Sequence, residues 1–295
     1  MLTLEQLVEI ARANSDALNV RVNEFSLGPV RFDFNSRRFL MGVINLSAGS
    51  WYRESVCLSA DRAIERGVIL HAQGAHIVDV GAESTLAQAE RVDQASQRSQ
   101  LLPVIKGLSE HKILVSIETY HPAVTKACLE AGASVINLTG TKSTEEIFRM
   151  AAAHNAAVII CYVQGTNVRE VADFDFTGDA IQQMSDYFAR QVELAHKAGV
   201  TRVLIDPGLG FYYRNLQDSA VRIRHQMNVF INSFRLRKLG VPVCHALPHA
   251  FEFFGEEVRS AEPFFAVLAA LGKTDLYRTH EVAKTRAVLE TLSVY

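Results

Sequence analysis

Three side chains that accept hydrogen bonds stand at the ends of apolar segments rich in β-branched residues: Glu118, Asn137 and Asp206. Each segment has the length and composition of a buried strand. Carboxylate and amide oxygens together suit a flat heterocycle that donates from an amino group and a ring N–H, such as an aminopyrimidinone. Each residue alone would more often be structural. Burying all three unpaired would cost several kcal/mol, so together they favour a ligand site.

Two further strand-end residues suit an anionic group. Asn45 can offer its amide oxygen to a hard cation such as phosphate-bound Mg²⁺, and a turn cap is the alternative. Arg278 precedes a predicted helix, where a guanidinium can bind a phosphate through two hydrogen bonds. The alternative for Arg278 is a surface salt bridge. Asp79, at the end of another apolar segment, is expected to hold loop backbone amides.

The segment from Asp206 to Phe211, Asp-Pro-Gly-Leu-Gly-Phe, is the most specific motif. Its two glycines permit close approach of the backbone to a ligand, and Phe211 could stack on a ring. A tight turn without ligand contact is the alternative. Farther upstream, the run Glu83-Ser-Thr85 could bind a substrate or cap the next helix.

These residues are carried by eight strand-like segments, which are 39–45, 76–79, 113–118, 134–137, 158–161, 203–206, 243–245 and 275–278. Enough chain for a helix separates each pair. The segments predict a closed parallel (β/α)8 TIM barrel, in which the carboxyl ends of the strands form the active-site face. An open, doubly wound α/β sheet is less favoured because no Gly-x-Gly-x-x-Gly follows the first segment.

A repeated glycine precedes four of these segments: Gly74, Gly132, Gly199 and Gly272. Each is expected to end a helix in the left-handed conformation. The helices are predicted at 59–73, 94–108, 121–130, 143–154, 177–197, 216–238, 257–271 and 282–292. Residues 1–38 form a predicted extension, with a helix over 2–17 and a hairpin within 20–34, and residues 39–295 form the barrel.

Composition excludes several classes of protein. The 30 basic and 32 acidic residues leave a net charge of −2, which offers no electrostatic footprint for nucleic acid or an anionic membrane. The four cysteines lack metal-site spacing, and Cys161 and Cys244 lie in apolar segments as expected for buried thiols. No apolar stretch approaches a membrane span, and the charged first residues do not form a signal peptide. We expect a soluble cytoplasmic protein.

Six motifs together resemble the pterin-binding family, and within it the dihydropteroate synthases. They occupy 41–50, 74–85, 116–120, 135–137, 205–211 and 278–280, and the similarity spans about residues 39–292. The resemblance implies a transferase that condenses a dihydropterin pyrophosphate with p-aminobenzoate in folate biosynthesis, with Mg²⁺ as cofactor. It also implies a homodimer formed through the C-terminal helices.

The resemblance assigns a role to each strand-end residue. Asn45 would hold the Mg²⁺–diphosphate as the metal ligand, while Arg278 and His280 would bind diphosphate oxygens, so that these three would be the catalytic residues. Thr85 would lie on the p-aminobenzoate side. The pterin would contact Glu118, which stands where the family usually has Asp, together with Asn137, Asp206, Phe211 and His249.

The chain departs from the family pattern at several loops. Pro248 and His249 replace an Arg and a Lys, and His249 is expected to substitute for that Lys. Leu86 and Ala87 replace an Arg-Pro pair, and the first loop ends on Trp51 without its usual acidic residue. Two alternatives therefore remain. One is a diverged paralogue that binds a pterin without condensing it, and the other is a methyl transferase. The retained diphosphate residues argue against methyl transfer.

Overall fold

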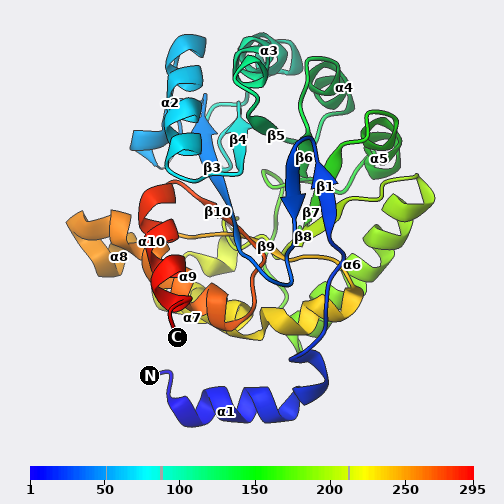
Figure 1. Ribbon diagram of the computed structural model, residues 1–295. Helices are drawn as coiled ribbons and strands as arrows, with labels where there is room; N and C mark the ends of the chain where they lie inside the picture. Colours follow the sequence, from blue (N-terminus) through cyan, green and yellow to red (C-terminus); the bar gives the residue numbers. More distant parts are fainter. Residues whose placement is uncertain (51, 87–88, 212) are drawn as a thin grey trace.

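The computed structural model describes residues 1–50, 52–86, 89–211 and 213–295, so Trp51 and Ala87 lie outside the described residues. Within these ranges eight strands form one parallel sheet in the order β8-β7-β6-β5-β4-β3-β10-β9. A bridge between Ile205 and Val243 joins the two end strands and closes the sheet. The protein is therefore a TIM barrel with helices around it (Figure 1), and the open-sheet alternative is excluded.

All eight predicted strand segments are strands, and their bounds shift by at most two residues. The longest shift is in the second, which extends past Asp79 to Gly81. The strands are β3 (Phe39–Asn45), β4 (Ile77–Gly81), β5 (Leu114–Thr119), β6 (Val135–Leu138), β7 (Ala157–Cys161), β8 (Val203–Asp206), β9 (Cys244–Ala246) and β10 (Leu276–Thr279).

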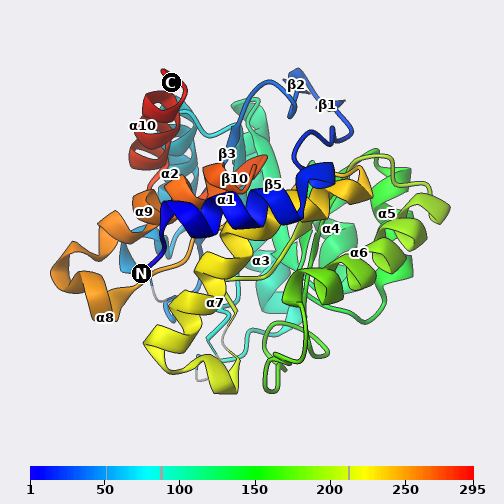
Figure 2. The same ribbon diagram turned by 90° about the horizontal axis from the view of Figure 1, so that it is seen from below.

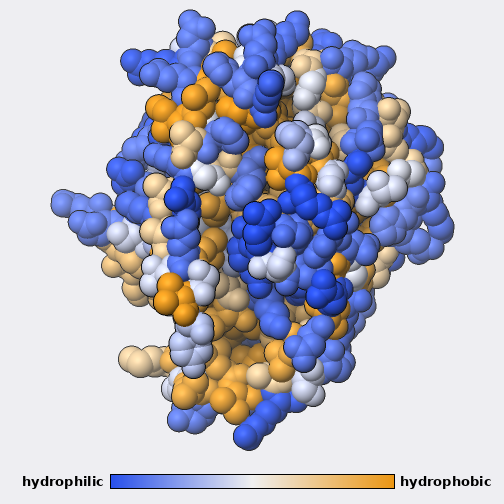
Figure 3. Space-filling view, viewed as in Figure 1, coloured by the Kyte–Doolittle hydropathy of each residue, from blue (hydrophilic) through white to orange (hydrophobic). Residues whose placement is uncertain are grey.

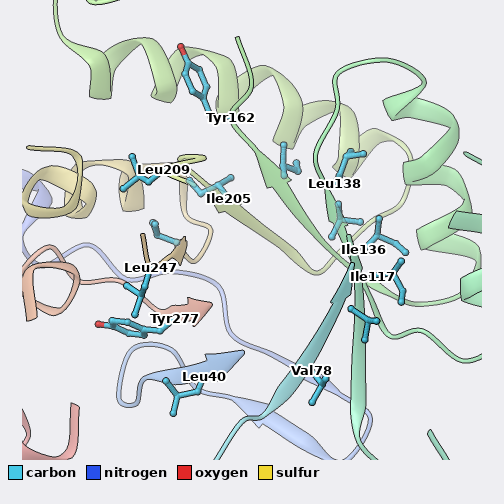
Figure 4. Close-up of a cluster of buried hydrophobic side chains, with 14 of the residues drawn as sticks. Leu40, Val78, Ile117, Ile136, Leu138, Tyr162, Ile205, Leu209, Leu247 and Tyr277 are labelled. Atoms are coloured by element: carbon cyan, nitrogen blue, oxygen red, sulfur yellow. The ribbon is translucent and has the colours of Figure 1, made fainter. Parts of the chain in front are cut away.

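Alternation along the strands decides which side chains enter the barrel. Val78, Ile117 and Ile136 pack outward against the helices, in the cluster of buried side chains in Figure 4. Their neighbours of opposite parity point inward, because successive side chains of a strand face opposite sides of the sheet. Asp79, Glu118 and Asn137 share the inward parity of Ile77, Leu114 and Val135, which form a second, inner cluster.

A hairpin fills the amino-terminal end of the barrel. Its strands β1 (Phe25–Leu27) and β2 (Val30–Phe32) pair antiparallel, as predicted. Phe32, Phe34 and Phe39 pack against one another within the inner cluster, with ring centroids 4.8–5.6 Å apart. The outer face over this end is largely hydrophilic (Figure 3). The apolar hairpin side chains therefore close one end of the barrel and leave the carboxyl ends of the strands as the hollow end.

The α-helices match most predicted ranges. They are α1 (Leu4–Ala13), α2 (Ala60–Ala72), α3 (Gln94–Glu110), α4 (Pro122–Glu130), α5 (Thr144–Ala153), α6 (Ala180–Lys197), α7 (Ser219–Asn232), α8 (Phe251–Phe254), α9 (Ala261–Leu271) and α10 (Val282–Leu292). Short 3₁₀ helices are η1 (Ser15–Ala17), η2 (Arg53–Ser55), η3 (Arg214–Leu216), η4 (Ser233–Leu239) and η5 (Gly255–Ser260). Figure 2 shows α1 lying across the outside of the helical layer, and α8 projecting at one side.

Two predictions about helices are wrong. The single helix expected over 216–238 ends at Asn232, because Ser233 turns its hydroxyl to the Val229 carbonyl at 2.7 Å and to His245 at 2.6 Å. The helix expected over 257–271 begins as a 3₁₀ turn and becomes α-helical only at Ala261. At Ser233 a side-chain contact accompanies the change from regular helical geometry.

Three of the four repeated glycines have the predicted left-handed conformation: Gly74, Gly132 and Gly199, with φ of 93–113°. Gly272 does not, and the left-handed residue there is Lys273. Gly272 is required for a different reason. A Cβ at this position would lie 1.7 Å from the Phe230 carbonyl oxygen, so the glycine permits the close approach of α9 to α7.

No helix in the described ranges is long and apolar enough to cross a membrane. All four cysteines are free and buried, as predicted for Cys161 and Cys244.

Candidate active site

The predicted site residues meet at the carboxyl end of the barrel. Asn45, Gly81, Glu118 and Asn137 are consecutive partners in the strand register, so they form one row across β3 to β6. Asp206 on β8 and Arg278 on β10 complete the ring from the other side. All of them except Gly81 line one hollow, together with Thr85, Phe211, His249 and His280. We call this hollow the mouth.

Arg278 lies between two carboxylates at the bottom of the mouth. Its Nε donates to Asp79 at 2.7 Å and its Nη2 donates to Glu118 at 2.6 Å. Asp79 is fully buried and also accepts from Ser116 at 2.6 Å and Asn137 at 3.2 Å. Asp79 therefore holds site side chains in place, and the loop-amide role expected for it is wrong.

Two carboxylates of the mouth, Glu118 and Asp206, have raised pKa values. Burial raises the pKa of Glu118, although the guanidinium of Arg278 opposes the rise. Burial also raises the pKa of Asp206 to about 6, against the hydrogen bond from the Gly208 amide at 2.8 Å. Desolvated carboxylates gain from a ligand that donates hydrogen bonds to them. The buried thiol of Cys161 donates to the Asn137 amide oxygen at 3.3 Å, which orients that amide.

The loop after β8 turns tightly at Gly208, where φ is +73°. A Cβ there would lie 2.5 Å from the Tyr162 carbonyl oxygen and 2.8 Å from the ring of Phe211. The glycine therefore lets the Phe211 ring fold back over the turn and line the mouth.

Asn45 is oriented by a hydrogen bond from its Nδ2 to the Ser55 hydroxyl. Its amide oxygen lies 4.0 Å from the place where Gly81 would carry a Cβ. The missing side chain at Gly81 thus leaves room beside an amide oxygen on the rim of the mouth.

His280 is fixed by a buried carboxylate. Its Nδ1 lies 2.6 Å from Oε1 of Glu262, and its backbone amide donates to Oε2 at 2.9 Å. Glu262, 1% exposed, also accepts from the Glu281 amide at 3.1 Å and from the Thr279 hydroxyl. With Nδ1 held by Glu262, Nε2 lies on the opposite edge of the imidazole.

Tyr52 connects the first loop to the same region. Its ring stacks on His280, with centroids 4.4 Å apart and planes 14° apart, and its hydroxyl donates to Glu281. Glu281 is also paired with Arg259 on η5. The loop after β3, the loop after β10 and the segment after β9 are therefore joined around one imidazole.

His249 lines the mouth, as predicted, but it is not a cation. Burial, with a smaller contribution from Arg222, lowers the pKa of His249 to about 4, so its imidazole is neutral at pH 7. The expectation that His249 takes the place of the lysine as a pterin contact stays a prediction, and it would act there through hydrogen bonding rather than through charge. A neutral imidazole can still donate or accept one hydrogen bond to a ligand.

The loop carrying Thr85 is held from across the barrel. Ser84 donates to the Gly49 carbonyl at 3.0 Å, which ties this loop to the first loop. Arg169, 8% exposed, donates to the carbonyls of Ser84 and, at 2.7 Å, Ala89. Thr85 thus lies on the rim of the mouth on a segment fixed by both neighbours.

Several residues of this region escaped the sequence reasoning: Tyr52, Arg169, Arg222, Gln226 and Glu262. None of them ends a strand. Arg222, Gln226 and Glu262 act from helices, and Tyr52 and Arg169 act from loops. The only available signal was the rarity of a buried charge on an otherwise apolar helix face, as at Glu262 between Ala261 and Phe265.

Comparisons with known proteins agree with this geometry. The family model described as pterin binding enzyme matches residues 41–246. A dihydropteroate synthase of Synechocystis is 29% identical over 268 residues, covering 87% of this chain and 89% of that protein. The solved dihydropteroate synthase of Xanthomonas albilineans with 4-aminobenzoic acid is 25% identical, with a TM-score of 0.73, and covers 90% of this chain and 94% of that chain. For the Thermus thermophilus enzyme in complex with 4-aminobenzoate the TM-score is 0.74 at 24% identity, and the coverage is 92% and 99%.

Proposed function

The chain belongs to the pterin-binding enzyme family, and from this premise we propose that it is a dihydropteroate synthase. It condenses a dihydropterin pyrophosphate with p-aminobenzoate in folate biosynthesis. The observation that carries the proposal is the ring of Glu118, Asn137 and Asp206 beside Asn45 and Arg278 at one mouth. The carboxylates and amide suit the donor edge of a pterin, and the arginine suits the diphosphate.

In the reaction the bond between the pterin methylene carbon and the diphosphate oxygen breaks. A bond from the amine nitrogen to that carbon forms, and the nitrogen loses a proton. Glu118, Asn137 and Asp206 orient the ring, and Phe211 packs beside it. Arg278 and His280 bind the leaving diphosphate and stabilise its developing charge.

Mg²⁺ fits the residues of the mouth as an ion that enters with the diphosphate. No group of three His, Cys, Asp or Glu side chains in the described ranges could form a metal cage. Mg²⁺ commonly binds through one or two protein oxygens plus substrate phosphates and waters. The amide oxygen of Asn45 is such a ligand, and the bound ion would neutralise charge on the leaving group.

Arg278 has to serve both parts of the substrate. It is paired with Asp79 and Glu118, and it can turn its remaining N–H groups to the diphosphate while it keeps Asp79. The release of Glu118 from Arg278 would make that carboxylate available to the pterin. Diphosphate and pterin are then expected to favour each other's binding.

The test is to incubate the purified protein with dihydropterin pyrophosphate, Mg²⁺ and p-aminobenzoate, and to measure diphosphate release and dihydropteroate. Stoichiometric formation of both products is expected. Pterin binding that strengthens with diphosphate, without any dihydropteroate, would instead indicate the diverged pterin-binding paralogue.

We also propose a homodimer in the cytoplasm, which sedimentation of the purified protein and fractionation of the source cells would test.

A further inference from the structure

The part of the mouth between β8 and β9 shares Phe211 and His249 with the proposed pterin contacts and lies apart from the strand-end residues assigned to the pterin and diphosphate. It is lined by Leu209 to Phe211 after β8, by Leu247 to His249 after β9, and by Arg222 and Gln226 from α7. Gln226 donates to the Leu209 carbonyl at 2.9 Å, which fixes α7 against the loop. An aromatic ring and a cation therefore border the same compartment.

Arg222 is a buried cation with hydrogen-bonding capacity to spare. It is 8% exposed, and its Nη2 donates to both carboxylate oxygens of Glu252, at 2.8 and 3.0 Å. Glu252 itself lies at the surface, with 44% of its side chain exposed. The buried Nε of Arg222 has no hydrogen-bond partner, and no hydrogen bond joins Nη1 to any residue that the structure describes.

A buried guanidinium N–H without an acceptor is costly, and a carboxylate is the acceptor that an arginine binds best. Arg278 illustrates the geometry within the same mouth, where one guanidinium is shared by two carboxylates. Glu252 occupies only one side of Arg222. The neighbouring His249 is neutral and adds no competing charge.

We propose that Arg222 binds the carboxylate of the acceptor amine and so selects aromatic amino acids of the p-aminobenzoate type over uncharged aromatic amines. Phe211, which packs beside the pterin, also borders the ring of the acceptor, and Arg222 binds the acid group at the far end of that ring. The inference rests on the proposed function, since it names the residue that recognises the second substrate. It also accounts for the absence of a cation at Pro248 and His249, because the guanidinium of Arg222 on α7 supplies the positive charge instead.

The test compares p-aminobenzoate with aniline, which lacks the carboxylate. Binding of each is measured by calorimetry to protein saturated with an unreactive pterin and diphosphate. The proteins are the wild type, Arg222→Gln, Arg222→Lys and, as matched control, Arg224→Gln at an exposed position of the same helix. Wild type and Arg224→Gln should prefer p-aminobenzoate by at least about tenfold, and Arg222→Gln should lose that preference.

Arg222→Lys keeps the charge but not the planar fork, so its preference should fall between those of the wild type and Arg222→Gln. If thermal melting shows that Arg222→Gln does not fold, the Arg222→Lys variant still tests whether Arg222 binds the carboxylate. A full preference in Arg222→Gln or in Arg222→Lys, or none in the wild type, would overturn the proposal. If the wild type prefers p-aminobenzoate through Arg222 but forms no dihydropteroate, only the proposed reaction fails.

Discussion

Glu262 holds His280 through two contacts, one to the ring and one to the backbone: Nδ1 to Oε1 at 2.6 Å and the amide nitrogen to Oε2 at 2.9 Å. The carboxylate comes from α9 and the imidazole from the loop after β10. The pairing therefore fixes the orientation of the ring independently of any ligand. A histidine held in this way needs no rotamer search when the diphosphate arrives, which reduces the entropic cost of binding.

Glu262→Gln should weaken diphosphate recognition without affecting the pterin contacts. The amide keeps the shape of the side chain but offers one oxygen where the carboxylate offered two, so the imidazole loses its fixed orientation. The affinity for dihydropterin pyrophosphate is expected to fall roughly tenfold, and the affinity for the unphosphorylated pterin should not change. Calorimetry with both ligands measures the two affinities. Glu256→Gln, at an exposed position of η5 just before α9, is the control. An equal loss for both ligands would mean that Glu262 supports the fold rather than His280.

Asp206→Asn should remove most of the pterin affinity. The asparagine oxygen can still accept from the Gly208 amide, so the turn is retained, but its NH₂ group faces the donor edge of the pterin. We expect a loss of roughly 100-fold, measured by titration with an unphosphorylated pterin. Asp173→Asn, at an exposed position of the loop after β7, is the control. Unchanged affinity in Asp206→Asn would remove this residue from the site.

The pterin affinity should depend on pH through Asp206, whose pKa burial raises to about 6. The ionised carboxylate is the form that accepts from the pterin, so binding favours the loss of its proton. The affinity should fall as the pH decreases through 6, by up to tenfold per pH unit. An unphosphorylated pterin avoids titration of the diphosphate in the same range. A flat profile between pH 5 and 8 would contradict the assignment.

Arg278→Gln should destabilise the protein as well as abolish diphosphate binding. It leaves Asp79 and Glu118 unpaired at 0% and 11% side-chain exposure, which typically costs about 3–5 kcal/mol. Arg278 lowers the pKa of Glu118, so loss of this cation raises the pKa of Glu118 further in the folded state. The folded variant then binds more protons than the unfolded chain, so its stability falls as pH rises from 5 to 8.

Urea unfolding of Arg278→Gln at several pH values tests this, with Arg286→Gln on the exposed face of α10 as control. A variant as stable as the wild type at pH 8 would show that the two carboxylates are paired in another way.

The sequence predicted the barrel well because repeated glycines mark the starts of four of its strands and because strand parity sets which side chains face inward. Glu118, Asn137 and Asp206 could be placed at one mouth on that basis. Arg222 and Glu262 could not, since both act from helices whose rotation about their axes depends on packing with distant segments. The left-handed conformation expected at Gly272 was wrong for a similar reason, because contact between α9 and α7 decides it.

The hairpin has a consequence for how this chain folds during synthesis. The inner cluster joins Phe32 and Phe34 to Leu276, near the other end of the sequence. The floor of the barrel therefore cannot be completed until almost the whole polypeptide has left the ribosome. The aromatic side chains of the hairpin therefore stay exposed until β10 has been synthesised. During that interval the nascent chain is expected to need protection from aggregation.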